Sequence, residues 1–162
     1  MSPAETARTV RLRLAAELAD DRRVLDRLAA SAGALLAPAA DARGEWMRAL
    51  ALAFETERYY TAVEALLQRV LRTVDGDVPR GPGWHQDLLR AAAVDIAGVR
   101  PALVTPAIVA ELRELLKFRH LARHGYEVEP SLARMVEHAQ RIVRVHPALT
   151  GVLATFAGWL AE

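Results

Sequence analysis

The residues best suited to chemistry lie in one stretch of eight, Arg119-His120-Leu121-Ala122-Arg123-His124-Gly125-Tyr126. Histidine exchanges a proton near neutral pH, and arginine binds phosphate and neutralises charge that develops on it. These groups suit the cleavage of RNA, because the 2′-hydroxyl is an internal nucleophile beside the phosphodiester and no metal is required. A polar, solvated helix end has the same composition, so residue types alone leave both interpretations open.

Spacing within the stretch decides which of these side chains share a helix face. His120 and His124 are four residues apart and lie on the same face. Arg119 and His124 are five apart, about 140° around an ideal helix and ~7.5 Å along it, so they do not converge within one regular helix. Gly125 predicts that the helix ends near His124, where exposed carbonyls favour an imidazolium. Two such ends facing each other across a dimer axis would build one cleft from two copies.

A zinc site is the other chemistry that this histidine pair suggests, because histidines at positions i and i+4 suit the metal. Metalloprotease helices place glutamate directly after the first histidine, and Leu121 occupies that position here. We therefore predict no metal and no cofactor.

Composition limits the class of protein. The 162 residues are 52% hydrophobic and 25% charged, which predicts a single globular domain spanning 1–162. There are no cysteines, which fits a reducing compartment. Neither an apolar run of about 20 residues nor a signal-peptide pattern is present, so we expect a soluble cytoplasmic protein without a membrane partner. The net charge of +1 does not by itself indicate a nucleic-acid-binding protein.

The elements that must position the stretch are all predicted to be helices. Alanine, leucine, arginine and glutamate dominate, and no convincing strand pattern appears. Thr105-Pro106 is a typical helix start and opens the helix that carries the stretch, whereas Pro147 is expected to kink or split the last helix. The predicted fold is an all-α, antiparallel up-and-down bundle of four main helices, the third and fourth broken. The expected ranges are 4–36, 41–74, 84–96, 105–124 and 130–160.

Apolar periodicity predicts which faces are buried. In the first helix the apolar stripe is Val10, Leu14, Leu18, Leu25 and Leu28. In the second helix the expected core face is Trp46, Leu50, Ala53, Tyr60, Leu67, Leu71 and Val74.

Several polar residues have expected roles in this bundle. Glu57 falls on the core face of the second helix and would pair with Arg119 or reach solvent. We interpret His85 as a feature of a helix start. His138 and His146 share a face of the last helix, which Arg134, Arg141 and Arg144 make basic. That face is expected to be solvated, and at most a modest RNA-facing surface.

The stretch resembles the signature of the HEPN superfamily: arginine, a polar residue, three variable residues and histidine, often followed by one more residue and tyrosine. Arg119, His120, His124 and Tyr126 fill its fixed positions. The surroundings resemble HepT-type toxins, with Tyr59-Tyr60-Thr61-Ala62-Val63-Glu64 in a long helix and Trp84-His85 after a Gly/Pro loop. The resemblance spans about residues 42–126.

This resemblance implies a metal-independent endoribonuclease that works as a homodimer, with arginine and histidine of both copies lining a shared cleft. It implies that Arg119 stabilises the transition state and that His124 transfers protons. His120, with Arg123 beside it, would orient the phosphate. HepT-type toxins are paired with a nucleotidyltransferase antitoxin of the MNT type, which can attach AMP to the motif tyrosine, here Tyr126. A bulky anionic group there would block RNA.

The sequence leaves two other functions to consider. A non-catalytic HEPN module would use the same bundle to dock a nucleotidyltransferase or another partner, and the intact Arg119/His124 pair argues against it. A helix-turn-helix DNA regulator fits poorly, because the turn near Ala97-Gly98 is followed by Val99-Arg100-Pro101 and by no basic recognition helix.

Overall fold

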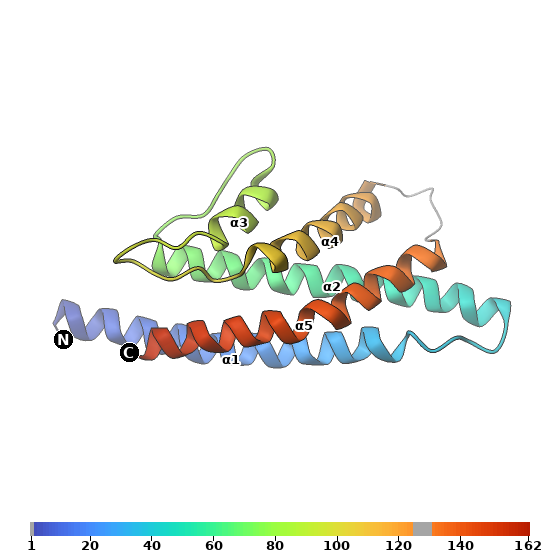
Figure 1. Ribbon diagram of the computed structural model, residues 1–162, viewed down its shortest axis with the longest axis horizontal. Helices are drawn as coiled ribbons and strands as arrows, with labels where there is room; N and C mark the ends of the chain where they lie inside the picture. Colours follow the sequence, from blue (N-terminus) through green and yellow to red (C-terminus); the bar gives the residue numbers. More distant parts are fainter. Residues whose placement is uncertain (1, 125–130) are drawn as a thin grey trace.

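The computed structural model describes the backbone of residues 2–124 and 131–162, and the side chains of 2–118 and 131–162. Within these residues every regular element is a helix, as the sequence predicted, and the helices form a bundle (Figure 1). They are α1 (Pro3–Ala34), α2 (Ala42–Val74), α3 (Trp84–Ala92), α4 (Pro106–His124) and α5 (Leu132–Ala161).

Local sequence explains where the helices begin. Ser2 and Glu5 form a capping box at the start of α1, each side chain accepting a hydrogen bond from the other's backbone N–H. Asp41 caps α2 by accepting a hydrogen bond from the N–H of Gly44 at 2.7 Å. At the start of α4, the Thr105 hydroxyl accepts a hydrogen bond from the N–H of Ile108 at 3.3 Å. The predicted caps at Asp41 and Thr105 are thus confirmed.

Three long helices form the body of the molecule. α1, α2 and α5 all contact one another, and α5 runs along α1 for much of its length (Figure 1). α3 and α4 lie over the C-terminal part of α2, and α4 also contacts α5. The core between them is mainly leucine, from Leu18 on α1 to Leu67 on α2 and Leu112 on α4, all fully buried.

Pro147 lies in the middle of α5, which continues as one helix from Leu132 to Ala161. The helix changes direction near its middle (Figure 1). Proline removes one backbone donor and its ring crowds the preceding turn, so a bend is the expected result. Of the two predicted effects, the structure shows the kink and not the split.

Some predicted core positions are wrong. Trp46 and Leu50 on α2 are 50% and 37% exposed, and Val10 on α1 is 39% exposed. Their spacing places them on an apolar face, but the described helices leave these side chains uncovered. Tyr60, Leu67 and Leu71 are buried as expected, because α2 has neighbours there.

The segment between α3 and α4 is organised by a buried arginine. α3 ends at Ala92, earlier than the predicted Ile96. The side chain of Arg100 is fully buried and contacts Asp75 at 2.6 and 2.8 Å. It also donates to the carbonyls of Val94 and Ala91 at 2.9 and 3.0 Å. These bonds attach the segment before α4 to the end of α2.

Candidate functional site

The last two turns of α4 carry the motif predicted from the sequence. α4 starts at Pro106 and is described as far as His124, so the helix carries the motif up to the position before Gly125; the predicted helix stop at Gly125 lies outside the described residues. Its buried face includes Leu112, Leu115 and Phe118, at most 9% exposed, so packing fixes the helix up to the turn that begins the motif.

The structure places the backbone of four predicted site residues, Arg119, His120, Arg123 and His124, on this one helix. Their side chains lie outside the described part of the chain, as does Tyr126. Since the helix continues through His124, Arg119 and His124 start about 140° apart around its axis. The backbone of one copy therefore does not by itself bring the two side chains together, as expected from their spacing.

An aromatic contact with α5 supports the turn just before the motif. Phe118 packs against the ring of His138, with 5.0 Å between ring centroids. Burial, and then the nearby Arg141 guanidinium, lower the pKa of His138. His138 is therefore neutral at neutral pH and acts as a half-buried packing residue, which corrects the prediction of a solvated histidine.

The basic residues of α5 are partly neutralised by α4. Glu111 accepts from Arg141 at 2.5 Å and lies 4.0 Å from Arg144. Arg141 was predicted to face solvent, but this ion pair ties α5 to the motif-bearing helix. The predicted RNA-facing charge of α5 is reduced accordingly.

A polar chain joins the three long helices. The Tyr59 hydroxyl on α2 lies 3.1 Å from His146 Nδ1 on α5, and His146 Nε2 lies 2.8 Å from Asp26 on α1. Burial, and then the Asp26 carboxylate, raise the pKa of Tyr59, so the phenol stays protonated and donates. His146 was expected on a solvated face, and it instead links α1, α2 and α5.

A second polar pair joins α2 to α3. His85 Nδ1 lies 2.5 Å from the buried carboxylate of Glu64, and its ring stacks on Trp84 with centroids 3.7 Å apart. His85 is thus at a helix start, as predicted, but it also contacts α2. Sequence reasoning missed both polar contacts because their members are 21 to 120 positions apart, and no local pattern marks such pairs.

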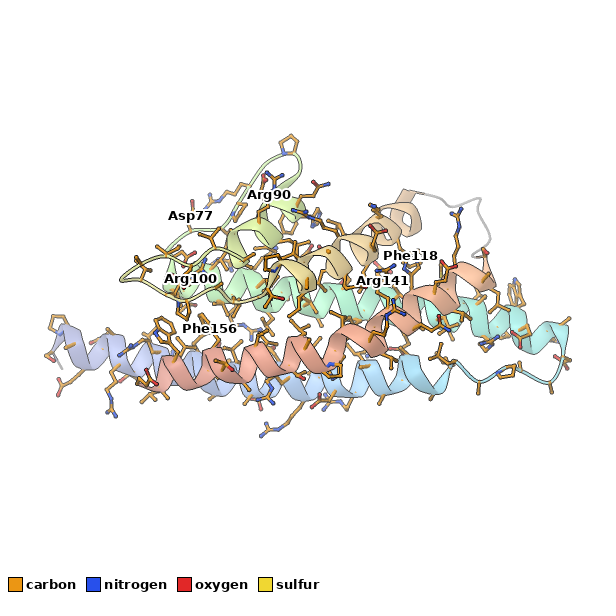
Figure 2. All side chains as sticks on the ribbon, viewed as in Figure 1. Asp77, Arg90, Arg100, Phe118, Arg141 and Phe156 are labelled. Atoms are coloured by element: carbon orange, nitrogen blue, oxygen red, sulfur yellow. The ribbon has the colours of Figure 1, made fainter. Side chains whose placement is uncertain are left out.

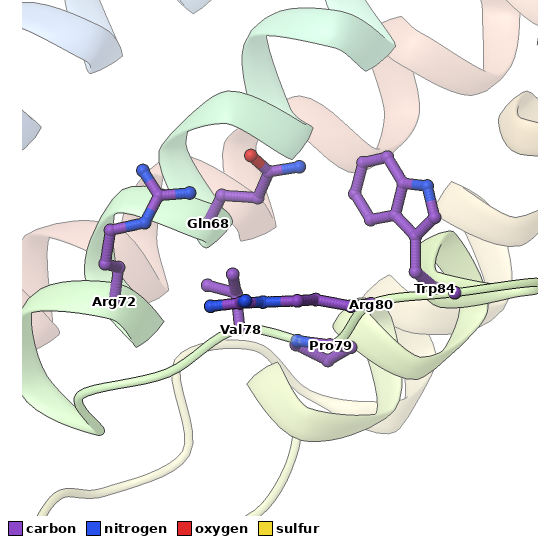
Figure 3. Close-up of a pocket in the computed structure, with 7 residues that line it drawn as sticks. Gln68, Arg72, Val78, Pro79, Arg80 and Trp84 are labelled. Carbon is purple, nitrogen blue, oxygen red and sulfur yellow. The ribbon is translucent and has the colours of Figure 1, made fainter.

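A hollow of about 380 Å³ lies between the C-terminal part of α2 and the loop before α3 (Figure 3). Arg72, Arg80, Gln68 and Trp84 line it, together with Val78, Pro79 and Gly81. None of these side chains transfers a proton near neutral pH. The hollow is therefore a poorer candidate for catalysis than the end of α4.

The described part of the chain has no cluster of three or more histidine, aspartate or glutamate side chains arranged to hold a metal ion. That cluster count leaves out His120 and His124, whose side chains are not described. Among the described residues, no helix has the length and apolar character of a membrane span.

These helices and the motif at the end of α4 define a helical bundle of the HEPN type. A family model described as "HepT-like protein" matches residues 51–160, which is more than half of the chain and includes the motif. The chain therefore belongs to the HepT-like family of the HEPN superfamily. Comparisons with curated proteins and with solved structures gave no match.

Proposed function

We propose that this protein is a metal-independent endoribonuclease toxin whose site is built around Arg119 and His124. The observation that carries the proposal is that Arg119 to His124, the first six residues of the motif, form the last turns of α4 in a chain of the HepT-like family. We place the active site in a cleft between two copies, because Arg119 and His124 leave one helix in different directions.

The chemistry follows from the residue types. His124 of one copy removes the proton from a 2′-hydroxyl, and the 2′-oxygen attacks the adjacent phosphorus. The bond from phosphorus to the 5′-oxygen breaks, and His124 of the other copy gives that oxygen a proton. Arg119 neutralises the charge that develops on the phosphoryl oxygens, while His120 and Arg123 hold the phosphate. The products are a 2′,3′-cyclic phosphate and a 5′-hydroxyl.

Regulation by a nucleotidyltransferase antitoxin of the MNT type is the second part of the proposal. The family relationship and the motif tyrosine at position 126 support it. AMP attached to Tyr126 adds a bulky anion next to the groups that bind phosphate. It would therefore repel and obstruct RNA.

Substitution of the two central residues tests the ribonuclease. Arg119→Ala and His124→Ala should each lower the rate of RNA cleavage by about 10²–10³-fold or more, because each removes transition-state stabilisation or proton transfer. Arg113→Ala is a matched control, since Arg113 is an exposed arginine on the same helix but outside the motif. Full activity in the Arg119→Ala/His124→Ala protein, with an unchanged helical circular dichroism spectrum, would refute the proposal.

Intact mass tests the antitoxin step. After co-expression with a cognate nucleotidyltransferase antitoxin of the MNT type, the protein should gain the mass of one or more AMP groups. Tyr126→Phe should abolish the gain and Tyr60→Phe should not, because Tyr60 is 1% exposed in the core. A gain of mass that persists in Tyr126→Phe would place the modification elsewhere.

A further inference from the structure

The N-terminal half of α2 exposes four large apolar side chains. Trp46, Met47, Leu50 and Phe54 are 50%, 54%, 37% and 60% exposed. Burying side chains of this size typically stabilises a protein by about 1.5–3 kcal/mol each. Four of them exposed within nine residues of one helix indicate a surface that binds another molecule.

These side chains form one continuous face. Trp46, Leu50 and Phe54 follow one another at intervals of four residues, and Met47 lies beside them. α3 and α4 lie over the C-terminal part of α2, whereas the N-terminal part extends past the end of α4 (Figures 1 and 2). We call Trp46, Met47, Leu50 and Phe54 the α2 apolar face.

The α2 apolar face has the same arrangement of residue types in both directions from Leu50. Trp46 lies four positions before Leu50, and Phe54 lies four positions after it. Arg43 lies seven positions before Leu50, and Glu57 lies seven positions after it. An antiparallel copy of α2 centred on Leu50 would therefore place Trp46 opposite Phe54 and exposed Arg43 opposite Glu57.

This symmetry about Leu50 indicates that the partner is a second copy of the same chain. In a twofold interface each patch must complement itself, and here large apolar groups meet apolar groups while opposite charges meet at both ends. A carboxylate has two oxygens, so Glu57 can accept from Arg43 of the second copy beside a contact within its own chain.

We propose that two copies pair through antiparallel α2 helices, with the twofold axis at Leu50. α4 packs on α2, and its C-terminal end lies over the middle of α2 (Figure 1). The pairing therefore puts both motif-bearing helix ends beside the same interface. The pairing itself is argued from α2 alone, and its use as a shared catalytic cleft rests on the proposed function.

Cysteine crosslinking tests the position of the axis, because the chain has no cysteine of its own. Packed helix axes are about 8–10 Å apart, which brings the two Leu50 Cα atoms within disulfide range at a twofold axis. The Leu50→Cys protein should form a covalent dimer under mild oxidation. Thr61→Cys is the matched control, since Thr61 is exposed on the same face but its copies would lie about 33 Å apart.

A mixed experiment fixes the register. Trp46→Cys and Phe54→Cys should each crosslink poorly alone, because identical positions are then about 12 Å apart along the helices. An equimolar mixture of the two should crosslink efficiently, as the two positions face each other. Light scattering of the unmodified protein should give the mass of a dimer.

Three results would overturn the pairing: a monomer at micromolar concentration, no covalent dimer from Leu50→Cys, or equal crosslinking of Thr61→Cys. The readout is independent of RNA cleavage. Crosslinking at Leu50 in a protein without ribonuclease activity would refute the proposed function alone, and cleavage by a protein that does not crosslink there would refute the α2 pairing alone.

Discussion

The buried arginine before α4 allows a quantitative test of the fold. Arg100 has a fully buried side chain, makes two bonds to Asp75, and donates to three backbone carbonyls. Arg100→Ala leaves these acceptors without their donor. Breaking a buried ion pair by removing one partner typically costs about 3–5 kcal/mol. Because the Asp75 side chain is 20% exposed and water reaches it, we expect a loss of about 3 kcal/mol.

This loss is measurable by urea unfolding followed by circular dichroism at 222 nm. For a chain of this length it corresponds to a fall in Tm of roughly 6–12 °C. The matched control is Arg80→Ala, which removes an Arg–Asp pair to Asp77 whose side chains are 82% and 76% exposed. We expect that control to change stability by less than about 1 kcal/mol. Equal effects of the two substitutions would refute the structural role given to Arg100.

Three further predictions follow from single contacts. The lowered pKa of His138 means that protonation favours the unfolded chain, so the free energy of unfolding should fall as the pH drops below about 6.5. His138→Gln should reduce the difference in free energy of unfolding between pH 7 and pH 5, measured by urea titration. An unchanged difference would contradict the half-buried, neutral state of His138. Tyr59→Phe should cost about 1 kcal/mol by removing the hydrogen bond to His146, and no loss would show that the bond contributes nothing. Leu50→Arg should give a monomer with unchanged helix content, and a stable dimer of that variant would argue against the α2 apolar face.

Much of the fold could be predicted because the signals are local. Asp41 and Thr105-Pro106 mark helix starts through interactions within one turn, and α2 and α4 begin there. The leucine spacing on α1 correctly identified Leu14, Leu18, Leu25 and Leu28 as buried. Such signals require no knowledge of the neighbouring helices.

The errors concern residues whose surroundings come from distant parts of the chain. Periodicity placed Trp46 and Leu50 on an apolar face, but it does not tell whether the chain's own core or another molecule covers that face. His138 and His146 were assigned to a solvated face, and their actual neighbours are Phe118 on α4 and Tyr59 on α2. Contacts between helices far apart in sequence leave no local pattern.

For the candidate site, the sequence predicted the helix that carries it better than the roles of its residues. The sequence placed Arg119 and His124 on one helix, and α4 contains the backbone of both. The helix stop predicted at Gly125 lies outside the described residues. Their catalytic roles come from the resemblance to HEPN ribonucleases, because helix geometry alone separates the two side chains. The exposed α2 apolar face gives a physical reason for two copies to pair. The sequence of the motif only suggested such a dimer.

The chemistry of the RNA ends, after incubation of RNA with the purified protein in excess EDTA, decides whether the ribonuclease is real and metal-independent. We predict fragments that end in a 2′,3′-cyclic phosphate and a 5′-hydroxyl, and no fragments from the Arg119→Ala/His124→Ala protein. Cleavage that requires an added divalent metal ion, or equal cleavage by the double variant, would contradict a metal-independent site at Arg119 and His124.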